Sequence, residues 1–210
     1  MNHTARQCNP ENTRQRLLAA AHREIYERGF QAASLERILA DTGLSKGALY
    51  HHFDTKQALG IAVVEEVIAA RVRREWIDPL MRAERPLEAL AGLLEQKLLN
   101  AAPENVRLGC DLNNLIQEMS PCDEVFRNAL HTVLQEWTDA LTQTLRRARA
   151  LGQIRPEVDC KQTALFIIAS MEGCAGLSKN LQDIEAYRGC MRTLGDYLQQ
   201  LGTHAAGQSA

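Results

Sequence analysis

The sequence predicts an all-α fold with about nine helices, and three observations support this prediction. Apolar residues recur at helical spacing over most of the chain, and capping residues or glycines mark the ends of these segments. Aromatic residues make up only 5% of the 210 residues, while Ala and Leu abound, which favours packed helices over sheets. No convincing alternation of apolar and polar residues indicates a strand.

Three helices are expected first. One runs from about residue 12 to 28 and ends at Gly29, a residue suited to a helix C-terminus. Two helices of about two turns follow, and Gly43 supplies the turn between them. Both short helices begin after a good N-cap, because serine side chains accept hydrogen bonds from the first free N–H groups. The caps are Ser34 and Ser45, and the helices are expected over 35–41 and 46–52.

The remaining helices are longer and form a bundle. A long amphipathic helix begins at Asp54 or Thr55 and reaches Met81. Ser120 is expected to cap the next long helix, with Pro121 at its first position. The other helices are expected over 86–99, 109–119, 163–179 after a cap at Asp159, and from Asp183 onward to about 198.

Composition excludes several classes of protein. No stretch approaches the roughly 18–20 apolar residues that span a bilayer, and the polar N-terminus is not a signal peptide, so we expect a cytoplasmic protein. The six cysteines are scattered without a C-x-x-C pair, which favours free thiols over disulfides or zinc. We therefore expect no metal and no cofactor. The net charge is −2, but residues 1–60 hold eight Lys/Arg against six Asp/Glu, a weak indication of a polyanion-binding end.

The segment 34–56 carries the strongest functional signal, since two short helices joined by a tight turn match the helix-turn-helix pattern. The first turn of the second helix, at 45–48, is nearly free of bulky side chains, so its backbone can approach the wall of a DNA major groove. Its polar residues can also form an ordinary solvated face. His51 and His52 do not suit a shared metal ion, because neighbouring residues on a helix point about 100° apart.

Residues 13–59 closely resemble the N-terminal domain of TetR-type transcriptional regulators. The resemblance rests on Glu27-Arg28-Gly29-Phe30, on Ser34-Leu35 and above all on LSKGALYHHFDTKQAL at 44–59. It implies a DNA-binding regulator, usually a repressor and not an enzyme, with a helix-turn-helix domain at 1–55 and a ligand-binding and dimerisation domain at 56–210. The DNA contacts that it implies are Ser34, Arg37, Ser45, Lys46, Tyr50, His51, His52 and Lys56.

Two of these residues have distinct expected roles. Lys46 is the side chain best able to read guanine in the major groove, whereas Lys56 resembles the family's phosphate anchor at a helix start. His51 departs from the family pattern, because many members have Tyr or another aromatic residue at that position. The other contacts mainly position the domain on the duplex.

The resemblance also implies a homodimer that binds double-stranded operator DNA and a small-molecule effector. One recognition helix reads few base pairs, so a second copy is needed for specificity. We expect dimerisation through the last two helices, where Ala169, Gly173 and Gly176 allow close approach; an intramolecular core is the alternative. A mostly neutral, partly apolar effector is expected. Its candidate lining residues are Trp76, Leu80, Cys110, Asn113, Asn114, Phe126, Trp137, Met171 and Cys174.

Three alternatives remain at this level. Cys110 follows Gly109 near a helix start, where the helix dipole can lower a thiol pKa, so the protein could be a redox or electrophile sensor. A helical small-molecule enzyme is a second alternative, with Glu118 and Glu172 as the carboxylates to test, although no catalytic motif is present. A helical protein–protein adaptor is the third, and it predicts no salt-dependent affinity for DNA.

Overall fold

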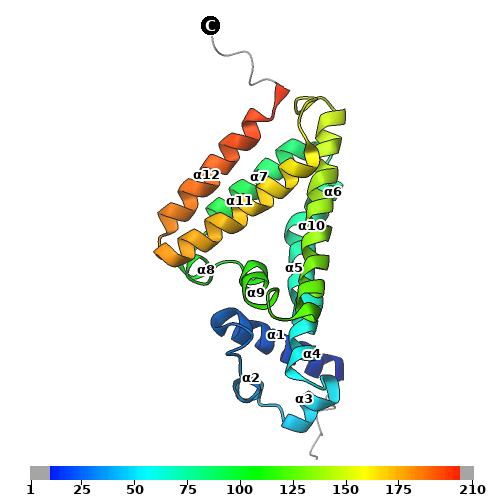
Figure 1. The fold of residues 1–210 in the computed structure, drawn as a ribbon, viewed down its shortest axis with the longest axis vertical. Coiled ribbons are helices and arrows are strands. Elements are labelled where there is room, and N and C mark those ends of the chain that lie inside the picture. Colours follow the sequence, from blue (N-terminus) through cyan, green and yellow to red (C-terminus); the bar gives the residue numbers. More distant parts are fainter. Residues whose placement is uncertain (1–9, 204–210) are drawn as a thin grey trace, which may run out of the picture. The chain divides into compact units, whose positions relative to one another are not determined.

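The computed structural model describes residues 10–203, and these residues form an all-α fold (Figure 1). Outside the helices, the described residues contain one isolated bridge, between Ile154 and Gly202. The predicted fold class is therefore confirmed. Cys8 lies outside the described residues. Among the described helices, none combines the length and apolar content that a membrane span requires.

Twelve α-helical segments are numbered in chain order over the described residues. They are α1 (Pro10–Arg28), α2 (Leu35–Thr42), α3 (Lys46–His52), α4 (Lys56–Ala62), α5 (Ala69–Val72), α6 (Asp78–Arg82), α7 (Pro86–Leu99), α8 (Pro103–Leu108), α9 (Asp111–Met119), α10 (Glu124–Ala150), α11 (Cys160–Leu181) and α12 (Ile184–Gln200). Helices α4, α5 and α6 form one continuous helix, because two π-helical segments, η1 (Val63–Ile68) and η2 (Arg73–Ile77), join them. This is the long helix that the sequence predicts.

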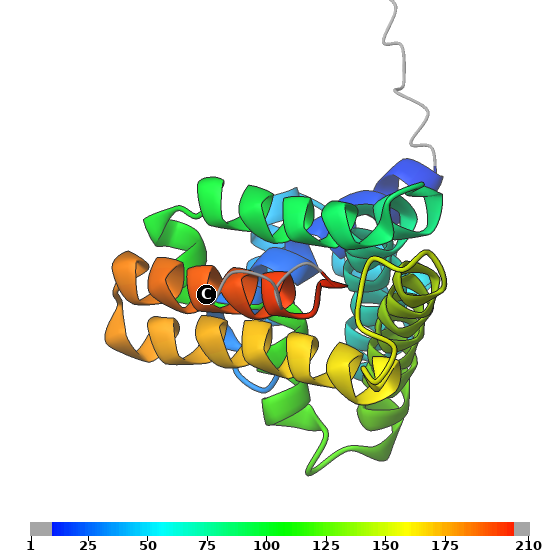
Figure 2. The same ribbon diagram turned by 90° about the horizontal axis from the view of Figure 1, so that it is seen from above.

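The chain divides into two compact units, and the division does not follow a single cut in the sequence. The first unit holds the residues up to Ala69 together with Asn114–Leu130. Its core includes Leu17, Ile38, Leu49, Leu59 and Phe126, each at most 2% exposed. The second unit holds Ala70–Asn113 and the chain from His131 onward. In that unit α12 packs against both α7 and α11 (Figure 2).

Most of the predicted caps are confirmed. The side chains of Ser34, Ser45 and Thr55 accept hydrogen bonds from N–H groups in the first turns of α2, α3 and α4. Asp159 and Asp183 do the same for α11 and α12. These caps work because the first N–H groups of a helix have no partner within the helix.

The predicted start of α10 is wrong. Ser120 and Pro121 lie in a turn, and α10 begins at Glu124, where the Asp123 carboxylate accepts a hydrogen bond from Phe126 N at 3.0 Å. The reason lies in the preceding helix, because the N–H groups of Cys122 and Asp123 bond back to the Met119 carbonyl and close α9. The short helix α8 was not expected either.

Candidate nucleic-acid interface

Helices α2 and α3 form the expected helix-turn-helix, and local contacts explain why. Ser34 Oγ accepts from Glu36 N at 3.2 Å and begins α2. Gly43, with φ of 62°, ends α2 and donates its N–H to the Leu39 carbonyl at 2.8 Å. Because a positive φ is accessible to glycine at little cost, the chain turns sharply there. Ser45 then begins α3 by accepting from Ala48 N at 3.1 Å.

One face of α3 is buried and the other is free to meet a partner. Leu49 is fully buried, while Lys46, Tyr50 and His51 are exposed and His52 is partly so. Within residues 10–203 Lys46 makes no ion pair, and its Nζ lies 6.0 Å from the Tyr50 ring centroid. A cation without a partner at the start of an exposed helix can bind a phosphate or a guanine edge.

Arg37, one of the predicted DNA contacts, is engaged within the protein. Its Nε donates to Glu24 Oε1 at 2.5 Å and its Nη2 donates to the Ala32 carbonyl at 2.7 Å. Glu24 Oε1 also accepts from Ser34 N at 3.1 Å. Burial acts to raise the pKa of Glu24, but these hydrogen bonds and the Arg37 charge lower it overall. The Glu24–Arg37 pair therefore braces the turn before α2, a role that no local pattern indicates.

Lys56, the predicted phosphate anchor, contacts the same turn. Its Nζ donates to the Gln31 carbonyl at 3.0 Å and lies 4.8 Å from the Phe30 ring centroid. Glu118 contacts this turn as well, because its carboxylate accepts from Phe30 N and from Gln31 N, both at 2.8 Å. The sequence indicated Glu118 only as a carboxylate to test for catalysis. In the structure it fastens α9 to the turn after α1.

Aromatic packing joins the segment 114–130 to the same unit. The Phe30 and Phe126 ring centroids are 4.4 Å apart, and both rings lie against Gly60, where a Cβ would come within 2.5 Å of Phe30 and 2.7 Å of Phe126. Gln57 Nε2 also donates to Asp123 at 2.6 Å. Phe126 and Asn114, two of the candidate effector residues, thus belong to the compact unit that contains the helix-turn-helix.

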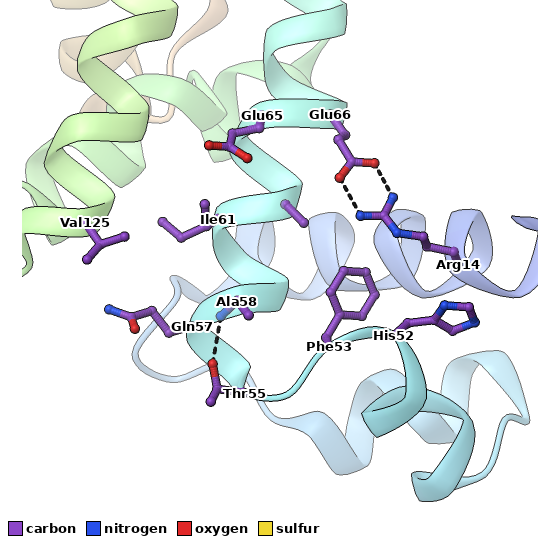
Figure 3. A pocket seen from close by; sticks show the side chains of 11 residues that line it. Arg14, His52, Phe53, Thr55, Gln57, Ala58, Ile61, Glu65, Glu66 and Val125 are labelled. Atoms are coloured by element: carbon purple, nitrogen blue, oxygen red, sulfur yellow. Dashed lines mark hydrogen bonds and ion pairs between the residues drawn. The ribbon is translucent and has the colours of Figure 1, made fainter.

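A surface pocket of about 420 Å³ lies in this unit between α1, α3 and the long helix (Figure 3). Arg14 spans its rim, binding both carboxylate oxygens of Glu66 and lying 5.1 Å from the Phe53 ring centroid. Glu65 and His52 add further polar groups. The residues that line the pocket include none of the nine candidate effector residues. We assign to Arg14 the role of holding α1 to η1.

The other effector candidates belong to the second unit. Trp76, Leu80 and Trp137 are buried, and the two indole rings lie 5.4 Å apart. Met171 and Cys174 are buried on α11, while Asn113 and Cys110 are partly exposed. The structure therefore places seven of the nine candidates in one unit. Their role in binding an effector stays a prediction.

The alternative in which Cys110 is an activated thiol is not favoured. Although the Cys110 residue is partly exposed, desolvation of its thiol raises its pKa strongly, and the charges of Glu172 and Asp111 raise it further, outweighing the lowering by Arg71. A thiolate is the reactive form of cysteine, so this environment keeps Cys110 as an unreactive thiol at neutral pH. The helix-dipole argument fails here mainly because desolvation disfavours the thiolate, and the nearby carboxylates add to that effect. The structure therefore does not favour a cysteine-based sensor.

Comparison with known proteins identifies the family. The model of bacterial regulatory proteins of the tetR family matches residues 17–63, and that of the tetracyclin repressor-like C-terminal domain matches residues 86–194. The chain belongs to the TetR family. It is 28% identical over 176 residues to an HTH-type transcriptional regulator of Lactococcus lactis encoded in the lacX 3' region, which covers 84% of this chain and 88% of the relative. It is 25% identical over 167 residues to the HTH-type transcriptional repressor DhaR of Mycobacterium sp. strain GP1, covering 76% and 79%.

Solved structures agree with this assignment. A TetR transcriptional regulator from Chloroflexus aurantiacus superimposes with a TM-score of 0.81 at 28% identity, covering 92% of this chain and 97% of that one. A TetR regulatory protein from Rhodobacter sphaeroides gives 0.77 at 27% identity, with 87% and 97% covered. The chain is therefore a DNA-binding transcriptional regulator of a family whose members are not enzymes. This confirms the predicted family and molecular class.

Proposed function

We propose that this TetR-family protein is a repressor that leaves a palindromic operator when a small molecule binds its C-terminal domain. The observation that carries the proposal is the exposed first turn of α3, where Ser45 caps the helix and Lys46 has no ionic partner among the described residues. The predicted repressor mode has the support of the relative DhaR, which is named a transcriptional repressor. We divide the roles at residue 55, with DNA reading in 1–55 and effector binding and dimerisation in 56–210.

A homodimer fits an uncovered apolar face on α11. Leu165, Phe166 and Leu177 are 48%, 52% and 65% exposed, and Ala169 lies on the same face. Among the described residues, a Cβ on Gly173 would meet nothing within 4 Å, and the same holds for Gly176, so residues 10–203 leave this face open. Exposed apolar stripes of this kind mark protein–protein contacts. We propose that α11 and α12 pair with those of a second copy, which places two recognition helices on successive major grooves.

Release requires that the effector prefer one arrangement of the two recognition helices over the other. The long helix over 56–82 contributes residues to both compact units, and so does α9. A change at an effector site in the second unit can therefore pass along continuous helices. Within the first unit, α9 ends at the Glu118 contact with the turn that precedes α2. We propose these two helices as the routes of coupling.

The test begins with selection of bound sequences from random duplex DNA, which yields a palindrome if the proposal holds. Lys46→Ala is then expected to weaken operator binding by about 1–3 kcal/mol and to relax specificity at one base step. Lys56→Ala should weaken all sequences alike and reduce the salt slope by about one unit. Arg82→Ala serves as the control, because it removes one exposed positive charge outside the proposed interface.

Two results would contradict the assignment. One is an equal effect of Lys46→Ala and Arg82→Ala on operator affinity, which would show only a loss of bulk charge. The other is the recovery of no sequence preference from the random pool. Because Lys56 also binds the Gln31 carbonyl, the unfolding of Lys56→Ala is measured in parallel to separate lost anchoring from lost folding.

A further inference from the structure

A partly buried polar cluster lies in the second unit, outside the helix-turn-helix. Arg71 on α5 binds Asp111 at the start of α9 through its Nη2, and its Nη1 lies 3.6 Å from Glu75. The Asp111 side chain is only 8% exposed. Glu172 on α11 accepts a hydrogen bond from the Cys110 thiol and interacts with the Arg71 charge. Tyr187 on α12 interacts with Glu172 and Cys110 as well, so residues from α5, η2, α9, α11 and α12 converge on this cluster.

Two members of this cluster have unmade hydrogen bonds. Arg71 Nε and Glu172 Oε2 are buried, and neither has a partner among the described residues. Buried polar atoms are nearly always hydrogen-bonded, because an unsatisfied one costs about 1–3 kcal/mol. The Nε group is a donor and the Oε2 atom can accept. Because Arg71 and Glu172 also interact through their charges, a small group that both accepts and donates suits this pair.

The charges of the cluster favour an uncharged ligand. Asp111 and Glu75 balance Arg71 and Lys97, whose Nζ lies 2.5 Å from Glu75. Burial raises the pKa of Glu172, which favours its neutral form. An ionic ligand would therefore bring a charge with no counter-charge into a partly buried site, which is costly.

Aromatic rings lie beside the cluster. Burial, with the charges of Cys174 and Glu172, raises the pKa of Tyr187 to about 12, so its ring carries a neutral hydroxyl. Lys97 Nζ lies 5.5 Å from the Trp76 ring centroid, and the Trp76 ring contacts the Trp137 ring at an interplanar angle of 39°. The indole N–H of Trp137 also has no partner among the described residues. Aromatic walls with few polar groups are typical of small-molecule sites.

We propose that the effector is a small uncharged hydroxyl compound, an alcohol or a phenol, whose hydroxyl accepts from Arg71 Nε and donates to Glu172 Oε2. This deepens the proposed function and rests on it in assigning the ligand as the effector. The hydroxyl group is both donor and acceptor, so a single oxygen has the capacity for both hydrogen bonds. The apolar remainder of the molecule packs against the neighbouring aromatic rings.

The test uses the protein's own fluorescence, because Trp76 and Trp137 are the chain's two tryptophans and both lie in this unit. Phenol, benzyl alcohol and cyclohexanol are the probes, with toluene as the isostere that lacks the hydroxyl and benzoate as the charged comparison. We expect at least one hydroxyl probe to bind tenfold or more tightly than both comparisons, since one hydrogen bond to a charged group contributes about 1.5–3 kcal/mol.

Variants identify the atoms. Arg71→Lys keeps the positive charge beside Asp111 but lacks Nε, and Glu172→Leu removes the carboxyl. Both should lose the tenfold hydroxyl preference. Glu95→Leu is the matched control, because Glu95 is exposed on α7 in the same unit, and it should keep the preference. Circular dichroism shows whether each variant is folded; if Glu172→Leu is not, the native protein and Arg71→Lys decide the question.

Three results would overturn the proposal: equal affinity for toluene and the hydroxyl probes, no fluorescence change with any hydroxyl probe at millimolar concentration, or a hydroxyl preference that survives in Arg71→Lys. Operator binding is measured separately with the same probes. A probe that binds with the expected preference but leaves operator affinity unchanged supports the hydroxyl site and refutes release by this ligand. A protein that binds no operator refutes the repressor role, while the fluorescence results still decide the site.

Discussion

Glu118 offers the sharpest test of how the first unit is held together. Its carboxylate accepts two backbone hydrogen bonds of 2.8 Å from the turn after α1, and a Cβ on Gly29 would approach both carboxylate oxygens to 3.0 Å. Net contributions of hydrogen bonds to a charged group are about 1.5–3 kcal/mol each. Water can replace the bond to the exposed Gln31, but less readily the one to the buried Phe30.

We therefore expect Glu118→Ala to lower the free energy of unfolding by about 2–3 kcal/mol, and Glu118→Gln by about 1–2 kcal/mol because the amide keeps one acceptor. With an m-value of about 2 kcal/mol/M, the alanine variant should unfold at a urea concentration roughly 1–1.5 M lower. Protein concentration is held fixed, because dimerisation adds to apparent stability.

The control is Glu27→Ala, which removes an exposed carboxylate from the same unit. We expect it to change the unfolding free energy by no more than about 0.5 kcal/mol. If Glu118→Ala were no more destabilising than Glu27→Ala, the two backbone hydrogen bonds would not fasten the turn, and the coupling route through α9 would lose its support.

Three further predictions concern packing, protonation and thiol chemistry. Gly60→Ala should destabilise the protein by about 1–3 kcal/mol in urea unfolding, because the new methyl group overlaps Phe30 and Phe126. Its control is Gly92→Ala, which places a methyl group in open space within α7 and should stabilise the protein by about 0.5–1 kcal/mol. A neutral outcome for Gly60→Ala would contradict that packing. The pKa of Glu172 is raised in the folded state, so stability falls as pH rises from about 4.3, the ordinary Glu value, to the raised folded value. Glu172→Gln should thus unfold at higher urea than the native chain at pH 8 and match it at pH 4; the reverse order would refute the assignment. N-ethylmaleimide at pH 7 should label exposed Cys122 well before Cys110, as peptide mass spectrometry would show, and rapid labelling of Cys110 would restore the sensor hypothesis.

The sequence predicted those helix starts that depend on contacts between residues close together in the chain. Ser34, Ser45 and Thr55 each determine a helix start through a contact two or three residues away, and such contacts are visible as cap patterns. The start of α10 was predicted at Ser120 because two cap patterns compete within four residues. The structure uses Asp123, since the residues before it are held by the end of α9.

Contacts between distant residues were not predictable in the same way. Glu118 and Phe30 are 88 residues apart, and Arg71 meets Asp111 across 40 residues. The apolar character of Phe126 predicted burial but not the partner, so it was placed with the effector candidates although it packs on Phe30. The chemistry of Cys110 depends on Glu172, a residue from a different helix, and no spacing along the chain shows this.

The packing of Phe30, Gly60 and Phe126 has a consequence for synthesis on the ribosome. The helix-turn-helix leaves the ribosome first, but its core is completed by a ring made 66 residues after Gly60. At about 5–20 residues per second, the nascent helices wait for roughly 3–13 s with Phe30 uncovered. A helix-turn-helix fragment that ends at residue 60, alone or fused to another protein, would keep this incomplete core. Any chimera that is designed to fold therefore has to include the segment 114–130 together with the helix-turn-helix.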